Sequence, residues 1–162
     1  MTGTINIIRA SGITPETAAA YSLGRTGKGL LTRVYRELRH LPAVYPGFAR
    51  WYFSRVCPEL GIRREIFLAM AEKRIAGVAI LKKGEENKIC TLKVHRDFSG
   101  KGIGKLLFEE SFSYLEEDRP FFTVSGAVRD LLTPFIKKYR FRLTGTLPGF
   151  YVQGLTEFIY NR

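Results

Sequence analysis

The sequence predicts an α+β fold of three layers, in which a mixed, mostly antiparallel central sheet carries helices on both faces. Three apolar runs of strand length, separated by short polar turns, predict an antiparallel meander over residues 65–71, 75–81 and 88–94. The third run leads through a glycine-rich turn into an amphipathic helix and a further strand. Such a unit needs a crossover, so its two strands run parallel. The 162 residues suffice for one domain, residues 1–162, with its own hydrophobic core.

The first sixty residues predict a strand followed by three helices. Thr14 is a favoured helix cap, Pro15 suits the first helical position, and Glu16 interacts well with the positive end of the helix dipole. After a glycine-rich stretch, apolar residues recur at spacings of three and four, which predicts a second helix. The expected elements are a strand over 5–9, a helix from Thr14 to about Leu23, a loop over 24–29, a helix over 30–41 and a helix from Pro46 to Val56.

The last sixty residues complete the crossover unit and add a terminal pair of strands. The helix after the glycine-rich turn buries an apolar face that includes Ile103, Leu107 and Phe108, and Pro120 follows its end. The expected elements are a helix over 102–117, a strand over 121–125, a helix over 128–139, and strands over 141–145 and 158–161. The exposed edges of such a sheet invite strand pairing between subunits, so a homodimer is compatible with this fold.

The chain is strongly basic, with 26 Lys and Arg against 15 Asp and Glu and a net charge of +11. Residues 1–50 contribute seven basic and two acidic side chains. In the second helix, Arg33, Arg36 and Arg39 lie away from the apolar stripe. These arginines form either a solvated face or a surface for a polyanion such as tRNA or another nucleic acid.

Three classes of protein are disfavoured by the rest of the composition. Residues 1–10 lack the cationic and apolar segments of a secretory signal. The apolar stretch over 75–81 is far too short to span a membrane. Cys57 and Cys90 make no disulfide framework, and their spacing fits no zinc motif. We therefore expect a cytoplasmic protein without a bound metal.

The glycine-rich turn predicts a phosphate-binding site. Glycines at 100, 102 and 104 let a ligand approach the main chain, and the following helix points free N–H groups and its positive dipole end at the same place. Lys101 and Lys105 add positive charge. A nucleoside triphosphate loop would need Ser or Thr after Gly100-Lys101, where Gly102 stands, and the glycine spacing does not match the dinucleotide fingerprint.

This turn resembles the acyl-CoA pyrophosphate loop of the GNAT family of N-acetyltransferases. The family pattern is Gln or Arg, two residues, Gly, any residue, then Gly or Ala, and it falls on residues 99–104, with Ser99 in place of the long polar side chain. The resemblance covers residues 64–162 well and the first sixty in outline. It implies acetyl-CoA as acyl donor, with a pantetheine arm between two splayed parallel strands. The implied cofactor-binding residues are Leu92, Lys93, Val94, Ser99, Gly100, Lys101, Gly102, Ile103, Gly104 and Lys105.

The usual acid and base of this family are both missing. A neutral amine must attack the thioester and the departing thiolate must gain a proton, so a base and an acid help. The family's strand glutamate falls near Cys90, and its helix tyrosine falls at Ile136, with Arg140 at the family's glycine. The candidate catalytic residues are therefore Tyr139, three residues beyond Ile136, His95 at the strand end, and Ser125 at the end of the following strand.

Three functions are compatible with these residues. The first is an N-acetyltransferase acting on a primary amine of a small molecule or protein. The second is a related enzyme acting on nucleic acid or aminoacyl-tRNA, and the third is a non-catalytic acyl-CoA-binding module. The resemblance places the helix from Pro46 and its preceding loop beside the acceptor pocket, where Tyr45, Trp51 and Tyr52 are candidate lining residues, although they suit a core equally.

Overall fold

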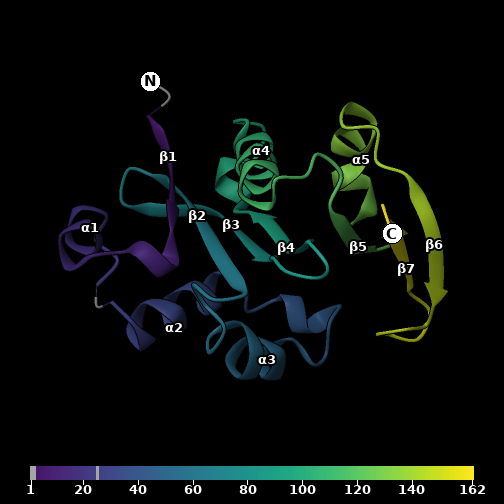
Figure 1. The fold of residues 1–162 in the computed structure, drawn as a ribbon, viewed down its shortest axis with the longest axis horizontal. Helices are drawn as coiled ribbons and strands as arrows, with labels where there is room; N and C mark the ends of the chain where they lie inside the picture. Colours follow the sequence, from purple (N-terminus) through teal and green to yellow (C-terminus); the bar gives the residue numbers. More distant parts are fainter. Residues whose placement is uncertain (1–2, 25) are drawn as a thin grey trace.

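The computed structural model describes residues 3–24 and 26–162 and contains the predicted three-layer fold around a mixed sheet (Figure 1). In this part of the chain seven strands follow the order β1-β2-β3-β4-β5-β7-β6. Their bounds are β1 Ile5–Arg9, β2 Arg64–Ala71, β3 Arg74–Lys82, β4 Lys88–Val94, β5 Phe121–Ser125, β6 Leu143–Pro148 and β7 Thr156–Tyr160.

The sheet is antiparallel everywhere except between β4 and β5. Strands β1 to β4 form the predicted meander with one further strand added at its edge. Strand β5 lies parallel to β4, and the crossover between them is the long helix α4, Ile103–Leu115. Strands β5, β7 and β6 are again antiparallel to their neighbours. The mixed sheet predicted from the crossover unit is confirmed.

Helices cover both faces of the sheet. Helix α4 and helix α5, Arg129–Lys138, lie above it in Figure 1, and helix α2, Lys28–Glu37, and helix α3, Phe48–Trp51, lie below. The short helix α1, Pro15–Ala20, belongs to the lower layer. Each face has its own apolar cluster, with Ile66, Leu68 and Ile80 on the α2 side and Phe67, Ala79 and Leu81 on the α4 side. This alternation is what a strand buried on both faces requires.

Three short 3₁₀ turns and one π-helical turn complete the described chain. The 3₁₀ turns are Ala10–Gly12, Leu41–Ala43 and Arg96–Phe98. The predicted helix from Pro46 is an α-helical turn followed by the π-helical turn Tyr52–Val56, in which the Cys57 N–H bonds the Tyr52 carbonyl at 3.0 Å. Tyr52 is fully buried and its hydroxyl donates to the Leu31 carbonyl at 2.8 Å. It is therefore a core residue and does not line a pocket.

The predicted loop over 24–29 is partly helical. Gly27 caps α2, which begins at Lys28. Arg25 lies outside the described residues. Within the described ranges, no helix is long and apolar enough to cross a membrane.

The terminal strands differ from the prediction in their bounds. Strand β6 begins at Leu143 and not at residue 141, because Phe141 is still part of the turn that ends α5. Its N–H bonds the Ile136 carbonyl at 2.9 Å, and Arg140 between them has a left-handed φ of 54°. This is a Schellman-type helix end, in which glycine is the preferred residue at the left-handed position.

We expect Arg140→Gly to stabilise the fold. A side chain at a left-handed position costs about 1 kcal/mol relative to glycine, and Arg140 forms no salt bridge within the described residues. Urea unfolding of the two proteins should show a higher midpoint for the variant with an unchanged slope. A lower midpoint would mean that packing of the arginine side chain stabilises the fold by more than the left-handed backbone costs.

Candidate active site

The glycine loop, Ser99–Gly104, lies at the start of α4, and its residues 99–102 are open to solvent. Gly100 and Gly102 have φ values of 75° and 77°, and a Cβ at either position would meet nothing within 4 Å. The first helical hydrogen bond runs from the Leu106 N–H to the Gly102 carbonyl at 3.1 Å. The preceding N–H groups of α4 therefore have no acceptor inside the helix and face the loop. Such a geometry suits the pyrophosphate of a CoA molecule.

The third glycine of the loop has a different role. Gly104 is buried, and a Cβ there would lie 2.8 Å from Cζ of Phe135 on α5. The absence of a side chain lets α5 pack closely on α4 at this point. Ile103, its neighbour, is also buried, and it packs in the apolar cluster on the α4 side. Ile103 and Gly104 therefore have only their backbone N–H groups to offer to a ligand at the loop.

The lysines of the loop are free to contribute charge. Lys101 lies with its ammonium 5.3 Å from the centre of the Phe98 ring, and Lys105 is loosely paired with Glu109 at 3.8 Å. Both side chains are exposed. Ser99, in place of the family's long polar residue, is exposed at the end of the 3₁₀ turn. The positive field at this loop comes from the helix end and from these two lysines.

Strands β4 and β5 separate as they approach the loop. Their register contains only the pairs Lys88–Phe121 and Ile89–Phe122. On the β3 side, Ile80 pairs with Thr91 and Leu81 with Ile89, which leaves Cys90 as the extra residue of a bulge. A bulge increases strand twist and turns the strand away from its neighbour. Beyond Ile89, the edge of β4 that faces β5 therefore has no strand partner, and its backbone groups can bond the amides of a pantetheine arm.

The three predicted cofactor residues on β4 lie along this free edge. Leu92 and Val94 point to the α4 side of the sheet, where they pack against its apolar cluster. Lys93 points to the opposite side, where its ammonium donates to the Glu37 carbonyl at 2.6 Å and so caps the end of α2. The Lys93 side chain is thus engaged in holding α2 on the sheet, and only its backbone faces the gap between β4 and β5.

His95 organises the turn that leads from β4 to the glycine loop. The ring Nδ1 of His95 accepts the Asp97 backbone N–H at 3.2 Å, and the backbone N–H of His95 donates to the Ala76 carbonyl at 2.8 Å. A neutral ring that accepts at Nδ1 carries its proton at Nε2. The contacts of His95 are those of a turn residue, and its position at the end of β4 keeps it beside the gap.

Tyr139 lies away from the glycine loop. Its ring packs in T-shaped contact with Phe112 at 4.9 Å and against Phe108 at 5.7 Å. Phe112 is nine residues from Ile103, which places it about 13 Å along α4 from the loop. Burial, reinforced by the charge of Glu109, raises the pKa of Tyr139. Its hydroxyl is buried without a hydrogen-bond partner among the described residues, so the geometry gives no support to Tyr139 as proton donor.

We expect Tyr139→Phe to leave turnover unchanged. The hydroxyl makes no described hydrogen bond, so its removal should keep or raise the free energy of unfolding, by up to about 1 kcal/mol. Steady-state kinetics and urea unfolding measure the two quantities. A fall in kcat of about tenfold or more would restore the proton-donor role to this residue.

A carboxylate that sequence reasoning missed lies at the opposite wall of the gap. Glu157 on β7 pairs across the sheet with Ser125, the last residue of β5, and is only 4% exposed. The Tyr45 hydroxyl donates to Oε1 of Glu157 at 3.1 Å and accepts the Ser125 N–H at 3.2 Å. Residues from three distant parts of the chain thus meet in one hydrogen-bonded cluster, which we call the Glu157 cluster.

The Glu157 cluster closes the α2 side of the gap. Tyr151, in the loop between β6 and β7, packs edge-on against Tyr45 with ring centres 5.0 Å apart. Burial raises the pKa of Tyr151, and the negative charges of Glu157 and Cys90, if ionised, act in the same direction. Tyr151 therefore lies near both Glu157 on β7 and Cys90 on β4. The predicted residue Ser125 belongs to this cluster, where its hydroxyl accepts the Ala127 N–H at 3.3 Å.

The protonation states of the Glu157 cluster suit a proton acceptor. Burial raises the pKa of Glu157 above its ordinary 4.5, while the hydroxyls of Thr123 and Tyr45 and the charge of Lys88 limit the rise. Burial, together with the Glu157 charge, raises the pKa of Tyr45, so this hydroxyl stays protonated. A carboxylate with a raised pKa is a stronger base than an exposed one, and Glu157 can therefore accept a proton from an ammonium.

Cys90, at the position of the family's glutamate, does not replace it. Burial raises the pKa of the Cys90 thiol, although nearby cations oppose this effect. Arg64 donates to Sγ at 3.4 Å and also stacks on Trp51, with the guanidinium carbon 5.3 Å from the ring centre. Cys90 is thus a thiol in the wall of the gap, and Trp51 is engaged by Arg64. Of the aromatic residues expected near the acceptor, Tyr45 is the one that contacts a candidate catalytic group.

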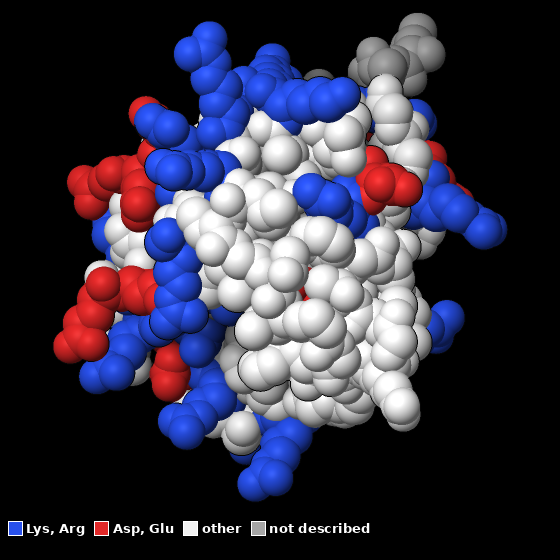
Figure 2. Space-filling view, turned by 90° about the vertical axis from the view of Figure 1, so that its right-hand side faces the viewer, with Lys and Arg blue, Asp and Glu red and all other residues white. Residues whose placement is uncertain are grey.

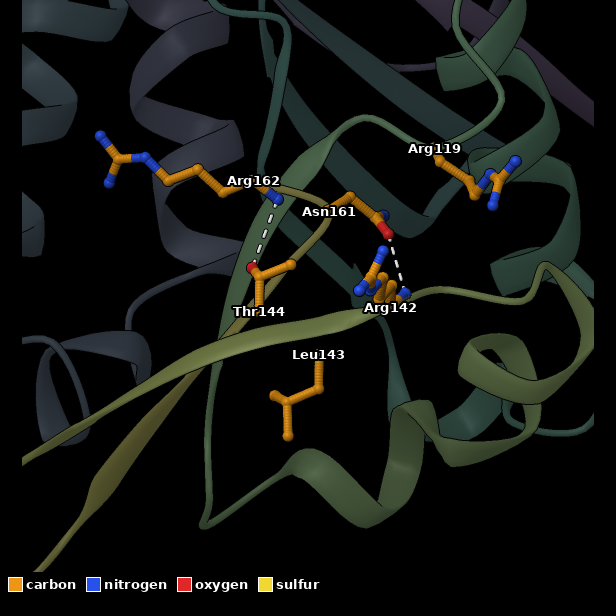
Figure 3. A pocket seen from close by; sticks show the side chains of 6 residues that line it. All are labelled: Arg119, Arg142, Leu143, Thr144, Asn161 and Arg162. Carbon is orange, nitrogen blue, oxygen red and sulfur yellow. Dashed lines mark hydrogen bonds between the residues drawn. The ribbon is translucent and has the colours of Figure 1, made fainter.

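Three arginines surround a separate depression at the other end of β5. It has a volume of about 590 Å³ and is lined by Arg119, Arg142, Leu143, Thr144, Asn161 and Arg162 (Figure 3). Asn161 accepts the Arg142 N–H at 2.9 Å, and Figure 3 shows the Arg162 side chain pointing away from the other two arginines. The depression shares no residue with the glycine loop or the Glu157 cluster. In the described ranges, no three His, Cys, Asp or Glu side chains are grouped as metal ligands would be.

Comparisons with known proteins agree with this geometry. The profile of the acetyltransferase (GNAT) domain family matches residues 58–156, which is more than half of the chain. No curated protein sequence matches the chain.

Three solved structures with this fold match 96–97% of the chain. A protein assigned to the GNAT acetyltransferases from Desulfovibrio desulfuricans is 19% identical, with a TM-score of 0.63 and 97% of both chains covered. A GNAT family acetyltransferase from Elizabethkingia anophelis, solved with acetyl-CoA, is 16% identical, with a TM-score of 0.56 and 96% of this chain and 95% of that chain covered. The ribosomal-protein-S18-alanine N-acetyltransferase from Escherichia coli is 13% identical, with a TM-score of 0.59 and coverages of 97% and 92%. On the family match and this shared fold, the chain belongs to the GNAT family of acetyltransferases.

Proposed function

We propose that this protein transfers an acetyl group from acetyl-CoA to a primary amine of a small molecule or protein. The observation that carries the proposal is the gap between β4 and β5, which has the open glycine loop at one end and the buried carboxylate of Glu157 at its wall. A donor site and a proton-accepting group thus meet in one place. The relatives with known ligands or acceptors support the same class of reaction, since one was solved with acetyl-CoA and another is an alanine N-acetyltransferase.

The donor side of the site follows from the backbone. The glycine loop and the N-terminus of α4 hold the pyrophosphate, Lys101 and Lys105 add positive charge, and the free edge of β4 holds the pantetheine amides. This arrangement brings the thioester between β4 and β5. Because these contacts are mainly to backbone groups, the substitution of Ser99 for a long polar residue removes one side-chain contact and leaves the others.

The acceptor arrives as an ammonium ion and must lose a proton before it attacks. In the proposed step Glu157 takes one proton from the ammonium, and the nitrogen lone pair forms a bond to the thioester carbonyl carbon. The carbon–sulfur bond then breaks, its electron pair leaves with sulfur, and the second proton of the nitrogen passes to the thiolate. The products are the amide, the free thiol of CoA and a protonated Glu157, which releases its proton to water.

The missing tyrosine at position 136 is tolerable in this scheme. Model alkyl thiols such as cysteine have a pKa of about 8.5, so a thiolate is a reasonable leaving group near neutral pH without a strong acid. Proximity and orientation of the two reactants then supply much of the rate. The proton acceptor is the group that the enzyme cannot omit, because an alkylamine with a pKa of about 10.4 is almost fully protonated at neutral pH.

A thiol-release assay tests the proposal. The protein is incubated with acetyl-CoA and a panel of primary amines and lysine-containing peptides, and free CoA thiol is measured with a thiol-reactive dye. We expect amine-dependent release above the rate without amine, and calorimetric binding of acetyl-CoA without binding of NAD or ATP. Binding of acetyl-CoA with no transfer to any amine would contradict an enzymatic role and indicate an acyl-CoA-binding module.

An amine carried on a nucleic acid is a second candidate acceptor. Arg36, in the last turn of α2, and Arg39, just after the helix, are exposed, and neither forms a salt bridge within the described residues. Unpaired arginines on a chain with a net charge of +11 favour polyanions. Binding of tRNA that weakens steeply with salt, and that falls when both arginines are replaced by glutamine, would support this candidate. Binding too weak to detect at low salt would exclude it.

A further inference from the structure

We propose that Glu157, Tyr45 and Tyr151 form the acceptor's ammonium subsite, and that the acceptor is an alkylammonium compound without an acid group beside its amine. This inference rests on the proposed acetyl transfer and names its substrate class. The three residues come from β7, from the segment before α3 and from the loop between β6 and β7. They meet on the α2 side of the gap, opposite the side on which α4 holds the CoA phosphates.

The carboxylate in this subsite has no salt-bridge partner among the described residues. Glu157 is 4% exposed and accepts the Tyr45 hydroxyl, yet it forms no salt bridge with any described residue. A buried carboxylate is stable as an ion only when hydrogen bonds or a positive charge compensate it. An ammonium group bound beside it would supply that charge, and an anionic group would be repelled.

The walls of the subsite are aromatic. The Tyr45 and Tyr151 rings meet at an interplanar angle of 81°, and Phe150 packs against Tyr151 at 4.6 Å. Aromatic faces attract ammonium ions, and they also accommodate an alkyl chain. Tyr151 and Phe150 are 43% and 59% exposed, so they lie at the mouth of the subsite, with Tyr45 and Glu157 deeper inside.

The surface around the mouth carries few charges. Figure 2 shows a broad area almost free of Lys, Arg, Asp and Glu on the face formed by β6 and the loop between β6 and β7, with basic side chains mainly above, to the left of and below it. Exposed apolar residues on this face include Leu143, Leu147, Phe150 and Tyr151. An alkylammonium compound can therefore approach without meeting a cation, and its apolar body has a matching surface.

The charges that face Glu157 come from several elements. Lys88 on β4 is the cation near it, and the hydroxyls of Thr123 on β5, Tyr45 before α3 and Tyr151 in the β6–β7 loop surround it. None of these groups neutralises the carboxylate by direct contact, because Lys88 stacks on Phe121 with its ammonium 4.6 Å from the ring centre. The ammonium of the acceptor would therefore be the cation in direct contact with Glu157.

A pair of substrates with one carbon skeleton tests the inference. n-Pentylamine and norvaline share five carbons, and norvaline adds a carboxylate beside the amine. We expect the wild-type kcat/KM to be at least about tenfold higher for pentylamine, because the carboxylate of norvaline would face Glu157. Glu157→Gln should lower kcat/KM for pentylamine at least about 100-fold and should narrow the difference in kcat/KM between the two substrates.

Two further variants separate the subsite from the general reaction. Tyr151→Ala should raise KM for pentylamine with little change in kcat, because it removes one aromatic wall of the subsite and leaves Glu157 in place. Tyr35 lies in the aromatic cluster between α2 and α3, away from the subsite, so Tyr35→Phe should change neither KM nor kcat. Equal or better use of norvaline, or an unchanged KM in Tyr151→Ala, would overturn the subsite. If the protein binds no acetyl-CoA or acetylates no amine at all, the proposed function itself fails.

Discussion

Replacement of Glu157 by glutamine should reduce kcat for amine acetylation about 100-fold or more while acetyl-CoA binds as before. The carboxylate is the proton acceptor proposed for the ammonium, and loss of a general base usually lowers the rate by a factor of about 10² to 10⁴. Glutamine keeps the size and can still accept the Tyr45 hydroxyl, so the local structure should persist. The glycine loop is built by other elements, which is why the dissociation constant of acetyl-CoA should not change. An unchanged kcat would remove Glu157 from the mechanism.

The same variant should fold at least as stably as the wild type. Because burial raises the pKa of Glu157, the folded protein holds this proton more tightly than the unfolded chain does. The ionised carboxylate therefore lowers stability as the pH rises from 4.5 through the folded pKa, and this loss is complete above it. Glutamine removes that loss at neutral pH. A markedly lower melting temperature for Glu157→Gln would show that its lost activity reflects unfolding.

Glu65 offers a matched control for this result. It is also buried, at 3% exposure, but it accepts hydrogen bonds from the N–H groups of Ser11 and Ile66 and from the Ser11 hydroxyl. It lies on β2, near the β1 edge of the sheet, whereas Glu157 lies on β7, near the β6 edge. Glu65→Gln should lower stability, because an amide accepts these bonds less well than a carboxylate. It should leave kcat of the folded protein unchanged. The two variants thus separate a structural from a catalytic buried glutamate.

The pH dependence provides a third readout of Glu157. In the scheme above, kcat rises with pH as Glu157 of the enzyme–substrate complex loses its proton. Burial raises the pKa of this carboxyl in the free protein, and the ammonium of a bound acceptor acts in the opposite direction. The profile of kcat/KM also contains the protonation of the free amine, so kcat is the cleaner measure. Glu157→Gln should lack the acidic limb of the kcat profile. Retention of that limb in the variant would assign it to another group.

Replacement of Gly102 by valine should abolish measurable acetyl-CoA binding, with a dissociation constant raised about 100-fold or more. The position has a φ of 77° and open space where a Cβ would lie, which is the space that phosphate oxygens need. The side chain would block that approach, and the left-handed backbone would also be strained. Calorimetric titration with acetyl-CoA measures the effect. Retained affinity would contradict the assignment of the glycine loop as the pyrophosphate site.

Gly24→Val is the appropriate control for the Gly102 variant. Gly24 has nearly the same backbone, with a φ of 78° and nothing within 4 Å of the place that a Cβ would take, and it lies between α1 and α2. Both variants should lose similar stability from backbone strain, and only the Gly102 variant should lose the cofactor. Gly104 is unsuitable for this comparison, because a side chain there would collide with Phe135 and disturb the packing of α5.

Much of this architecture could be predicted from the sequence because its signals are local. The meander follows from three apolar runs, and the crossover unit follows from a strand, a glycine turn and an amphipathic helix that are contiguous in the chain. The glycine loop is contiguous as well, so its residues, from Ser99 to Gly104, could be identified before its geometry was known. The fold class and the family are confirmed.

The acceptor side could not be predicted because its residues meet only through long-range contacts. Glu157 and Tyr45 are 112 residues apart, and they meet because β7 pairs with β5 beside the segment that precedes α3. One local signal was present: Glu157 stands beside Phe158 in a mostly apolar strand, and neighbouring residues of a strand face opposite sides of the sheet, which predicts a carboxylate on one face. The sequence prediction began this strand at residue 158, so it left Glu157 outside. Tyr139 shows the reverse case, since helical spacing placed it near Ile136 without showing that the aromatic cluster holds it away from the loop.

Mass spectrometry of the acceptor tests the central claim most directly. n-Pentylamine is incubated with acetyl-CoA and either the wild-type protein or the Glu157→Gln and Gly102→Val variants. We predict that the wild type produces N-acetylpentylamine in an amount equal to the CoA released, and that each variant produces far less. CoA release without acetylated amine, or equal product from the wild type and Glu157→Gln, would contradict an acetyltransferase that uses this carboxylate.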